Sequence, residues 1–179
     1  MQYVGKLLVA TPNQKDPFWS KTVIWLYECN QDNYAGLIIN KPSAKNCGDL
    51  AEHHNIAWRT NVPLFVGGPV NPSALILAHT TEWRTANTQL VTHSNVSLSS
   101  HVSMLTRLSR GDEPENWRLM LGYSGWAPGQ LDRELKDSAG WMVTDFQEEL
   151  LWDRRRPEVV WHQALDSATQ QAVDKLFEI

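Results

Sequence analysis

The stretch of residues 119–135, LMLGYSGWAPGQLDREL, constrains the fold more than any other part of the chain. Residues 118–121 form an apolar run typical of a buried strand, and the glycines within residues 122–125 predict a turn directly after it. A helix is predicted over residues 130–137. Such a turn serves either as a tight corner over the core or as a cradle of backbone N–H groups for an anion. The corner is favoured, because folds reuse such turns for many purposes.

Length and composition predict one soluble globular domain over residues 1–179. The chain is 42% hydrophobic and 20% charged, which excludes a disordered chain. Its formal net charge of −4 argues against a general electrostatic grip on DNA or on acidic membranes. The nine tryptophans predict half-exposed aromatic side chains at edges or interfaces.

The chain is predicted to be cytoplasmic, with no membrane contact. It has no run of eighteen apolar residues, and its first residues lack the pattern of a signal peptide. Cys29 and Cys47 are too few for a disulfide framework and are expected to be reduced.

The order of apolar runs predicts an α/β (α+β) fold, with a mixed, largely antiparallel sheet or barrel-like core flanked by helices. Further strands are predicted over residues 5–10, 22–28, 34–40, 62–66, 74–79, 88–92 and 140–144, and helices over 48–54, 99–110 and 157–164. Residues 148–152 are ambiguous. Ser167 and Gln170 match a capping box, which predicts a separate final helix. Its inward face is expected to carry Ala172, Val173, Leu176 and Phe177.

No catalytic, metal or cofactor motif is complete. Gly122-Tyr123-Ser124-Gly125-Trp126 departs from the serine nucleophile pattern Gly-x-Ser-x-Gly at Trp126. The six histidines lack the spacing that places two ligands on one face. The glycine-rich segments match no phosphate-loop motif, and Pro69 and Pro128 remove N–H groups that a phosphate cradle uses. We therefore predict no catalytic residue, no metal and no cofactor.

Four blocks of sequence carry a family resemblance. They read GKLLVATP with DPF, GLIINKP, FVGGPV and LGYSGWAPGQL, at residues 5–12 with 16–18, 36–42, 65–70 and 121–131. In this order they resemble the YqgE/AlgH family of bacterial proteins and cover nearly the whole chain. The resemblance implies a single cytosolic α/β domain with a mixed sheet or barrel-like core. It also implies a role in transcriptional regulation, as described for alginate production, although most relatives are described as uncharacterised.

This sequence departs from the family pattern at two places. Relatives commonly read Glu-His-Asn where this chain has Glu28-Cys29-Asn30, and they often carry an acidic residue and arginine where it has Ser73-Ala74. A family site that used that histidine or arginine would be remodelled here. The positions that persist mostly shape the backbone: Gly36, Asn40, Pro42, Gly67, Gly68, Pro69, Gly122, Gly125 and Gly129.

Three functional hypotheses follow. The leading one is a regulatory or interaction protein that binds a protein partner or a small ligand near its glycine-rich turns. Its predicted binding residues are Asn40, Lys41, Gly67, Gly68, Tyr123, Trp126 and Gln130. The alternative is a hydrolase-like enzyme that uses Ser124 or Tyr123 with Asp132 or Glu134. The least favoured is direct DNA binding through residues 154–156, a run of three arginines. The oligomeric state stays open.

Overall fold

The structure, a computed structural model, describes residues 2–137 and 139–178. Within these residues the chain forms ten strands and five helices. The strands are β1 (Lys6–Ala10), β2 (Val23–Asn30), β3 (Asn33–Ile38), β4 (Pro42–Asn46), β5 (Pro63–Val66), β6 (Val70–Thr80), β7 (Gln89–Leu90), β8 (Val96–Ser99), β9 (Trp117–Trp126) and β10 (Trp141–Asp145). The helices are α1 (Cys47–His53), α2 (Ser103–Ser109), α3 (Gln130–Asp137), α4 (Glu148–Trp152) and α5 (Pro157–Phe177).

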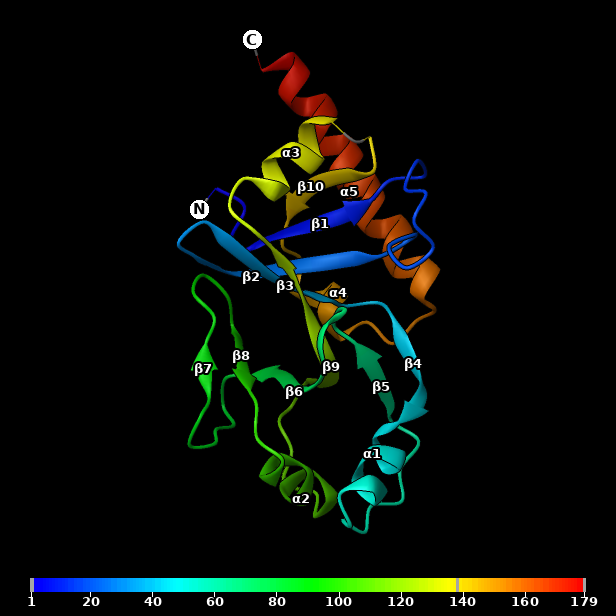
Figure 1. Cartoon of the computed structure of the whole chain (residues 1–179), viewed down its shortest axis with the longest axis vertical. Helices are drawn as coiled ribbons and strands as arrows, with labels where there is room; N and C mark the ends of the chain where they lie inside the picture. Colours follow the sequence, from blue (N-terminus) through cyan, green and yellow to red (C-terminus); the bar gives the residue numbers. More distant parts are fainter. Residues whose placement is uncertain (1, 138, 179) are drawn as a thin grey trace.

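The strands form one curled, largely antiparallel sheet (Figure 1). Its order is β10-β1-β2-β3-β9-β6-β8-β7, with β4 and β5 attached beside β9. The pairing of β5 with β9 is parallel, and the other strand pairs are antiparallel. The predicted α+β class with a mixed sheet is confirmed.

The central strands are buried on both faces, which explains their continuous apolar runs. Successive side chains of a strand point to opposite faces of the sheet. On β1, Leu7 and Val9 pack into a cluster that includes residues of α4 and α5, whereas Leu8 and Ala10 pack with Leu131 of α3. A third cluster lies beneath α1 and α2, around Cys47, Met104 and Leu105.

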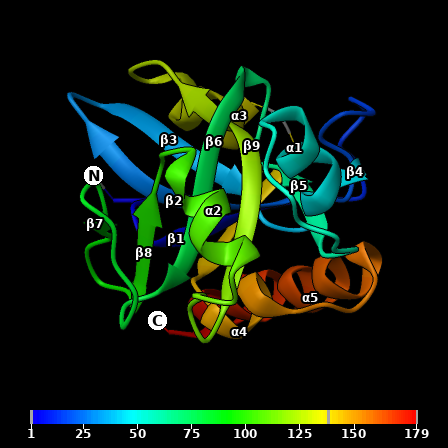
Figure 2. The same ribbon diagram turned by 90° about the horizontal axis from the view of Figure 1, so that it is seen from below.

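Strand β9 lies at the centre of the sheet. The prediction of a turn at residues 122–125 is wrong. The strand continues through these glycines to Trp126 and pairs with β3, β5 and β6. It runs beside β6 over most of its length (Figure 2). Glycine has a high local turn preference, but here hydrogen bonds to neighbouring strands keep the segment within the sheet, with Gly122 at a positive φ of +70°. The turn begins after Trp126.

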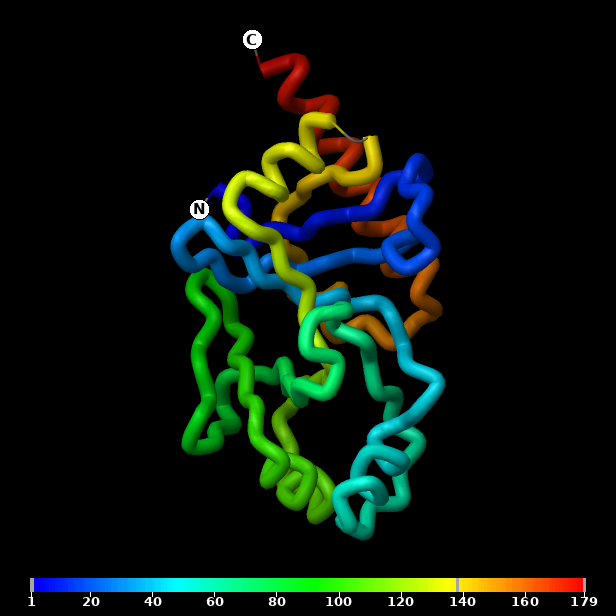
Figure 3. Tube along the Cα trace, in the orientation of Figure 1, coloured from blue at the N-terminus to red at the C-terminus, as the bar shows by residue number. Residues whose placement is uncertain are grey.

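Helix α5 is one helix of 21 residues, so the predicted break at Ser167 is also wrong. The Ser167 hydroxyl donates to the carbonyl of Gln163 one turn earlier, at 3.1 Å, instead of capping a new helix. The last turns of α5 run past the rest of the chain (Figure 3). The residues expected to face inward are therefore exposed: Ala172, Val173, Leu176 and Phe177.

Strands β4 and β8 are not predicted from the sequence, because they carry too few apolar residues. The ambiguous residues 148–152 form α4. All nine tryptophans lie in the described part of the chain, and each is buried or half-buried. Five are buried, and the prediction of half-exposed tryptophans is confirmed for the other four, which are Trp19, Trp58, Trp117 and Trp152.

Candidate ligand-binding site

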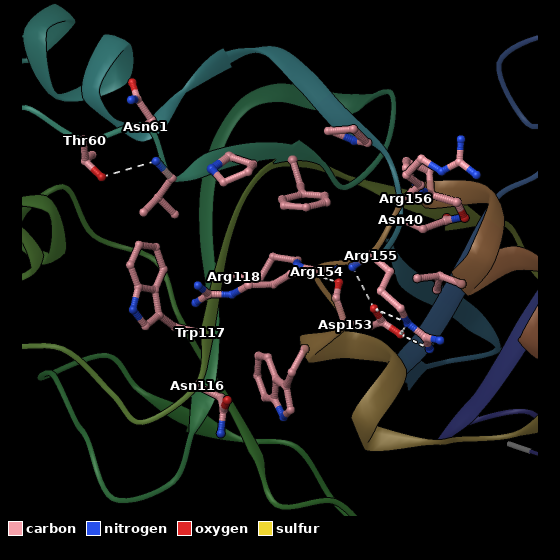
Figure 4. A pocket seen from close by; sticks show the side chains of 17 residues that line it. Asn40, Thr60, Asn61, Asn116, Trp117, Arg118, Asp153, Arg154, Arg155 and Arg156 are labelled. Carbon is pink, nitrogen blue, oxygen red and sulfur yellow. Dashed lines mark hydrogen bonds and ion pairs between the residues drawn. The ribbon is translucent and has the colours of Figure 1, made fainter.

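A hollow of about 570 Å³ opens beside the beginning of β9 (Figure 4). Three parts of the chain line it: residues 60–65 of the loop before β5 and of β5 itself, residues 116–118 at the start of β9, and residues 152–157 between α4 and α5. Asn40, Pro42 and Val160 complete its wall. Its volume lies within the range of about 300–1,000 Å³ that is usual for pockets that hold small molecules.

Arg118 lies in this wall and is almost completely buried, with 5% of its surface exposed. One terminal nitrogen donates to the carbonyl of Ile39, and the other donates to the carbonyl of Asp153 at 2.6 Å. The guanidinium lies over the ring of Phe65, 4.1 Å from its centroid. Among the described residues, no carboxylate lies within ion-pair distance of it. Arg118 is therefore a buried cation held by backbone carbonyls and an aromatic face.

The electrostatic setting of Arg118 favours an anion. Burial lowers the pKa of its guanidinium to about 10; Asp153 opposes this shift, and Arg154 adds to it. The side chain remains charged at neutral pH. A buried charge without a paired counter-charge is destabilising, and an anion that entered the pocket would reduce that destabilisation.

Three consecutive arginines add to this positive charge. The side chain of Arg155 is paired with Asp153, with an Nε–Oδ2 distance of 2.9 Å, and these hydrogen bonds lower the pKa of the Asp153 carboxyl. The side chains of Arg154 and Arg156 are exposed and make no hydrogen bond or ion pair with the described residues. The wall thus combines four arginines with one aspartate, in a chain whose formal charge is −4.

The opposite side of the pocket is aromatic and amide-bearing. Figure 4 shows Asn61, Asn116 and Trp117 on the side away from Arg154 and Arg156, with Arg118 between the two groups. The indole of Trp117 is half-buried and lies 6.1 Å from that of Trp58. The side-chain amides of Asn61 and Asn116 make no hydrogen bond with the described residues. They lie at the margin of the hollow, and in Figure 4 both point away from its centre.

Of the predicted site residues, Asn40 lines this pocket, but its side chain serves the fold. Its oxygen accepts from the Val23 amide at 2.8 Å, and its nitrogen donates to the carbonyls of Lys21 and Pro157 at 2.9 and 3.1 Å. Lys41 points elsewhere: its ammonium donates to the carbonyl of Phe18 at 2.6 Å and lies 4.0 Å from the centroid of that ring. Burial lowers the pKa of Lys41, and Asp16 opposes the shift.

Gly67, Gly68 and Tyr123 meet where the chain crosses β9. Strand β5 pairs with one edge of β9 and β6 with the other, so the link between them passes over the β9 backbone. A Cβ on Gly67 would lie less than 3.0 Å from the Gly122 carbonyl, and one on Gly68 equally close to the Tyr123 backbone. These glycines allow close packing of two backbones, as the sequence suggested, and leave no room there for an anion.

Trp126 and Gln130 lie in a separate, smaller cavity of about 310 Å³. The indole N–H of Trp126 donates to Glu134 at 3.2 Å, and the side-chain amide of Gln130 donates to the same carboxylate at 2.8 Å. Trp19 and Trp141 also line this cavity. The predicted binding residues are therefore divided among different places and do not form one pocket.

Neither serine–histidine chemistry nor a metal site is supported by the geometry. The Ser124 hydroxyl is completely buried and donates to the carbonyl of Gly67 at 3.1 Å. His79 Nε2 lies 2.8 Å from Ser99 Oγ, but Ser99 is 1% exposed and a substrate has no access to it. The described residues contain no group of three or more potential ligands placed to hold a metal ion, and both cysteines are free thiols.

Sequence reasoning missed the central residue of the basic pocket. Arg118 stands at the start of an apolar run, where a charged residue looks like an exposed strand end. For residues 154–156 the sequence predicts only an exposed basic run. The contacts that define the pocket join Arg118 to Ile39 and Asp153, residues far away in the sequence. The available signal is an arginine that directly precedes Leu119 and Met120, two apolar residues that are buried in the strand.

Fold and site together define a single-domain α+β protein with a curled sheet and a basic pocket. Within residues 2–137 and 139–178, no helix combines the length and apolar character needed to cross a membrane. The chain belongs to the AlgH-like family, whose family model matches residues 7–172.

Individual relatives agree with this assignment. The chain is 32% identical to a UPF0301 protein of Ruegeria pomeroyi, over 92% of this chain and 91% of the relative. It is 34% identical to a UPF0301 protein of a Marinomonas strain, over 84% of this chain and 81% of that one. The solution structure of the AlgH protein from Pseudomonas aeruginosa matches with a TM-score of 0.77 and 26% identity, over 98% of this chain and 93% of that one.

Proposed function

We propose that this protein is a cytoplasmic regulatory protein that binds a small anionic ligand in the pocket around Arg118. The observation that carries the proposal is a buried arginine in a hollow that also presents Arg154 and Arg156, none of the three having a carboxylate partner among the described residues. Arginine is well suited to recognise carboxylate and phosphate groups, because its planar N–H groups match their geometry.

A binding role is favoured over catalysis by the composition of the wall. Among the described residues that line the pocket there is no histidine, cysteine, lysine or glutamate. The single carboxylate, that of Asp153, is held by Arg155. General acid–base and nucleophilic mechanisms need such a group with a free proton or lone pair facing the substrate.

Direct DNA binding receives less support. Residues 154–156 face a hollow of small-molecule size, and Asp153 neutralises one of the three arginines. Duplex binding requires several cations arranged along a phosphate backbone. The regulatory role is therefore assigned to ligand binding and to a partner that responds to it.

Anion-dependent stabilisation tests this proposal. Thermal unfolding is followed in phosphate, sulfate and citrate, each compared with chloride at equal ionic strength. A ligand at about 100 times its Kd stabilises a protein by about 2.7 kcal/mol, which raises the Tm by several degrees. We expect such a rise for the natural chain and at most half of it for the double variant Arg154→Gln/Arg156→Gln.

A charge-matched control separates the pocket from general charge effects. Arg84 and Arg110 are also exposed, and their side chains make no hydrogen bond or ion pair with the described residues. The variant Arg84→Gln/Arg110→Gln removes the same charge elsewhere and is expected to keep the full rise in Tm. The proposal is wrong if no anion stabilises the natural chain, or if the pocket variant keeps the full rise.

A further inference from the structure

We infer that the ligand of the basic pocket is an aromatic organophosphate with the size of a nucleoside monophosphate. This inference rests on the proposed function and adds the chemical class of the ligand. It uses the division of the pocket into a cationic side and an aromatic, amide-bearing side, shown in Figure 4.

The cationic side suits a phosphate group. Within residues 2–137 and 139–178, the side chains of Arg154 and Arg156 and the remaining N–H groups of Arg118 find no hydrogen-bond partner. Several cations around one ligand group complement a phosphate, which carries up to two negative charges, better than they complement a carboxylate, which carries one. The first turn of α5 adjoins this side and has no side-chain cap, so its backbone adds positive potential there.

The other side suits a flat, nitrogen-containing ring. Trp117 offers a half-buried indole, and a nucleobase of any identity can stack on an aromatic side chain. Asn61 and Asn116 lie on either side of Trp117, and in Figure 4 their amides point away from the hollow, so each reaches the edge of a ring on the indole only by rotating its side chain. A simple phosphate would leave this side of the pocket empty.

The size of the hollow supports one ring system joined to one phosphate. Its volume of about 570 Å³ accommodates a ligand of that class together with some water. The aspartate in the wall does not oppose the phosphate, because Arg155 holds its carboxylate in four hydrogen bonds, one from its backbone amide and three from its side chain.

Calorimetric titration tests the inference with three kinds of probe: the four nucleoside monophosphates AMP, GMP, CMP and UMP, the four matching nucleosides, and inorganic phosphate. We expect at least one monophosphate to bind tenfold or more tightly than both its nucleoside and inorganic phosphate. Arg154→Gln/Arg156→Gln should weaken binding of that monophosphate and of phosphate by tenfold or more.

Variants on the aromatic side complete the test. Trp117→Leu and Asn61→Ala should weaken binding of the monophosphate and leave binding of inorganic phosphate unchanged. Asn61 is exposed, so the second variant retains the fold even if the first does not. If phosphate binds and no monophosphate binds more tightly, the inference fails and the proposed function stands. If citrate, sulfate and phosphate also fail to bind, both fail.

Discussion

Gly67 lies directly against the carbonyl oxygen of Gly122, at the point where the chain crosses from one edge of β9 to the other. The amide of Gly67 donates to the carbonyl of Leu121 at 2.8 Å, and its own carbonyl accepts from the Ile38 amide at 2.9 Å. The crossing is therefore hydrogen-bonded to β9 and to the chain at the end of β3. Glycine is required here because a Cβ would overlap a neighbouring backbone, which has no flexible end that could move away.

Gly67→Ala and Gly122→Ala are predicted to destabilise the protein strongly. Overpacking of a rigid site of this kind costs about 3 kcal/mol, and Gly122 also has a positive φ of +70°, which adds strain for alanine. Gly125→Ala is the control, because its Cβ would lie 3.7 Å from the nearest atom outside its neighbours, an ordinary contact. Urea unfolding measures the difference. Equal stability of Gly67→Ala and Gly125→Ala would contradict the crossing geometry.

Asn40→Ala is predicted to destabilise the protein by about 3 kcal/mol, since it leaves buried backbone groups without partners. The Asn40 side chain joins the amide of Val23 to the carbonyls of Lys21 and Pro157, and so ties β2 to the first residue of α5. Asn61→Ala, on the exposed rim of the same pocket, should change the free energy of unfolding by less than about 0.5 kcal/mol. If Asn40→Ala lowered the free energy of unfolding as little as Asn61→Ala, the three hydrogen bonds of the Asn40 side chain would contribute little to stability.

Asn40 also shows how far sequence reasoning reaches. The block around it was recognised as important, because Asn and Pro after an apolar run mark a strand end. The sequence predicts a ligand-binding role for Asn40, because its bonding partners in the fold lie 17 to 117 positions away along the chain and no local pattern reveals them. Strand positions, the fold class and the family could be predicted, because they depend on local periodicity and on ordered blocks of sequence.

Features that depend on tertiary contacts could not be predicted. The glycines of residues 122–125 favour a turn by local preference, and pairing with β3 and β6 keeps them within β9. Ser167 and Gln170 match a cap pattern, yet nothing in the packing stops α5 at that point. Arg118 became a candidate binding residue only when the fold brought the α4–α5 link beside it.

Stability is predicted to fall on acidification through the buried His79. Burial lowers the pKa of His79, and the hydrogen bond to the Thr80 carbonyl opposes that shift. The unfolded chain therefore binds a proton near pH 6.5 that the folded chain binds only at lower pH, so the free energy of unfolding decreases as pH falls below about 6.5.

The variant His79→Gln isolates this contribution. Its free energy of unfolding should depend less on pH between 7 and 5, by up to about 1.4 kcal/mol per pH unit. His53 is exposed, and His53→Gln serves as the matched control that should keep the natural pH dependence. Identical pH profiles for the natural chain and His79→Gln would exclude His79 as the source.

At the exposed C-terminal end of α5, the structure and the sequence pattern predict opposite effects of substitution. Leu176 and Phe177 are 69% and 81% exposed, although their spacing predicts an inward face. Leu176→Gln and Phe177→Gln should each change the free energy of unfolding by less than about 0.5 kcal/mol. Trp161, earlier on the same helix, is buried and donates its indole N–H to the Ala10 carbonyl at 2.6 Å, so Trp161→Ala should cost about 3–5 kcal/mol. Losses of about 2 kcal/mol or more at Leu176 and Phe177 would mean that these side chains pack against the fold.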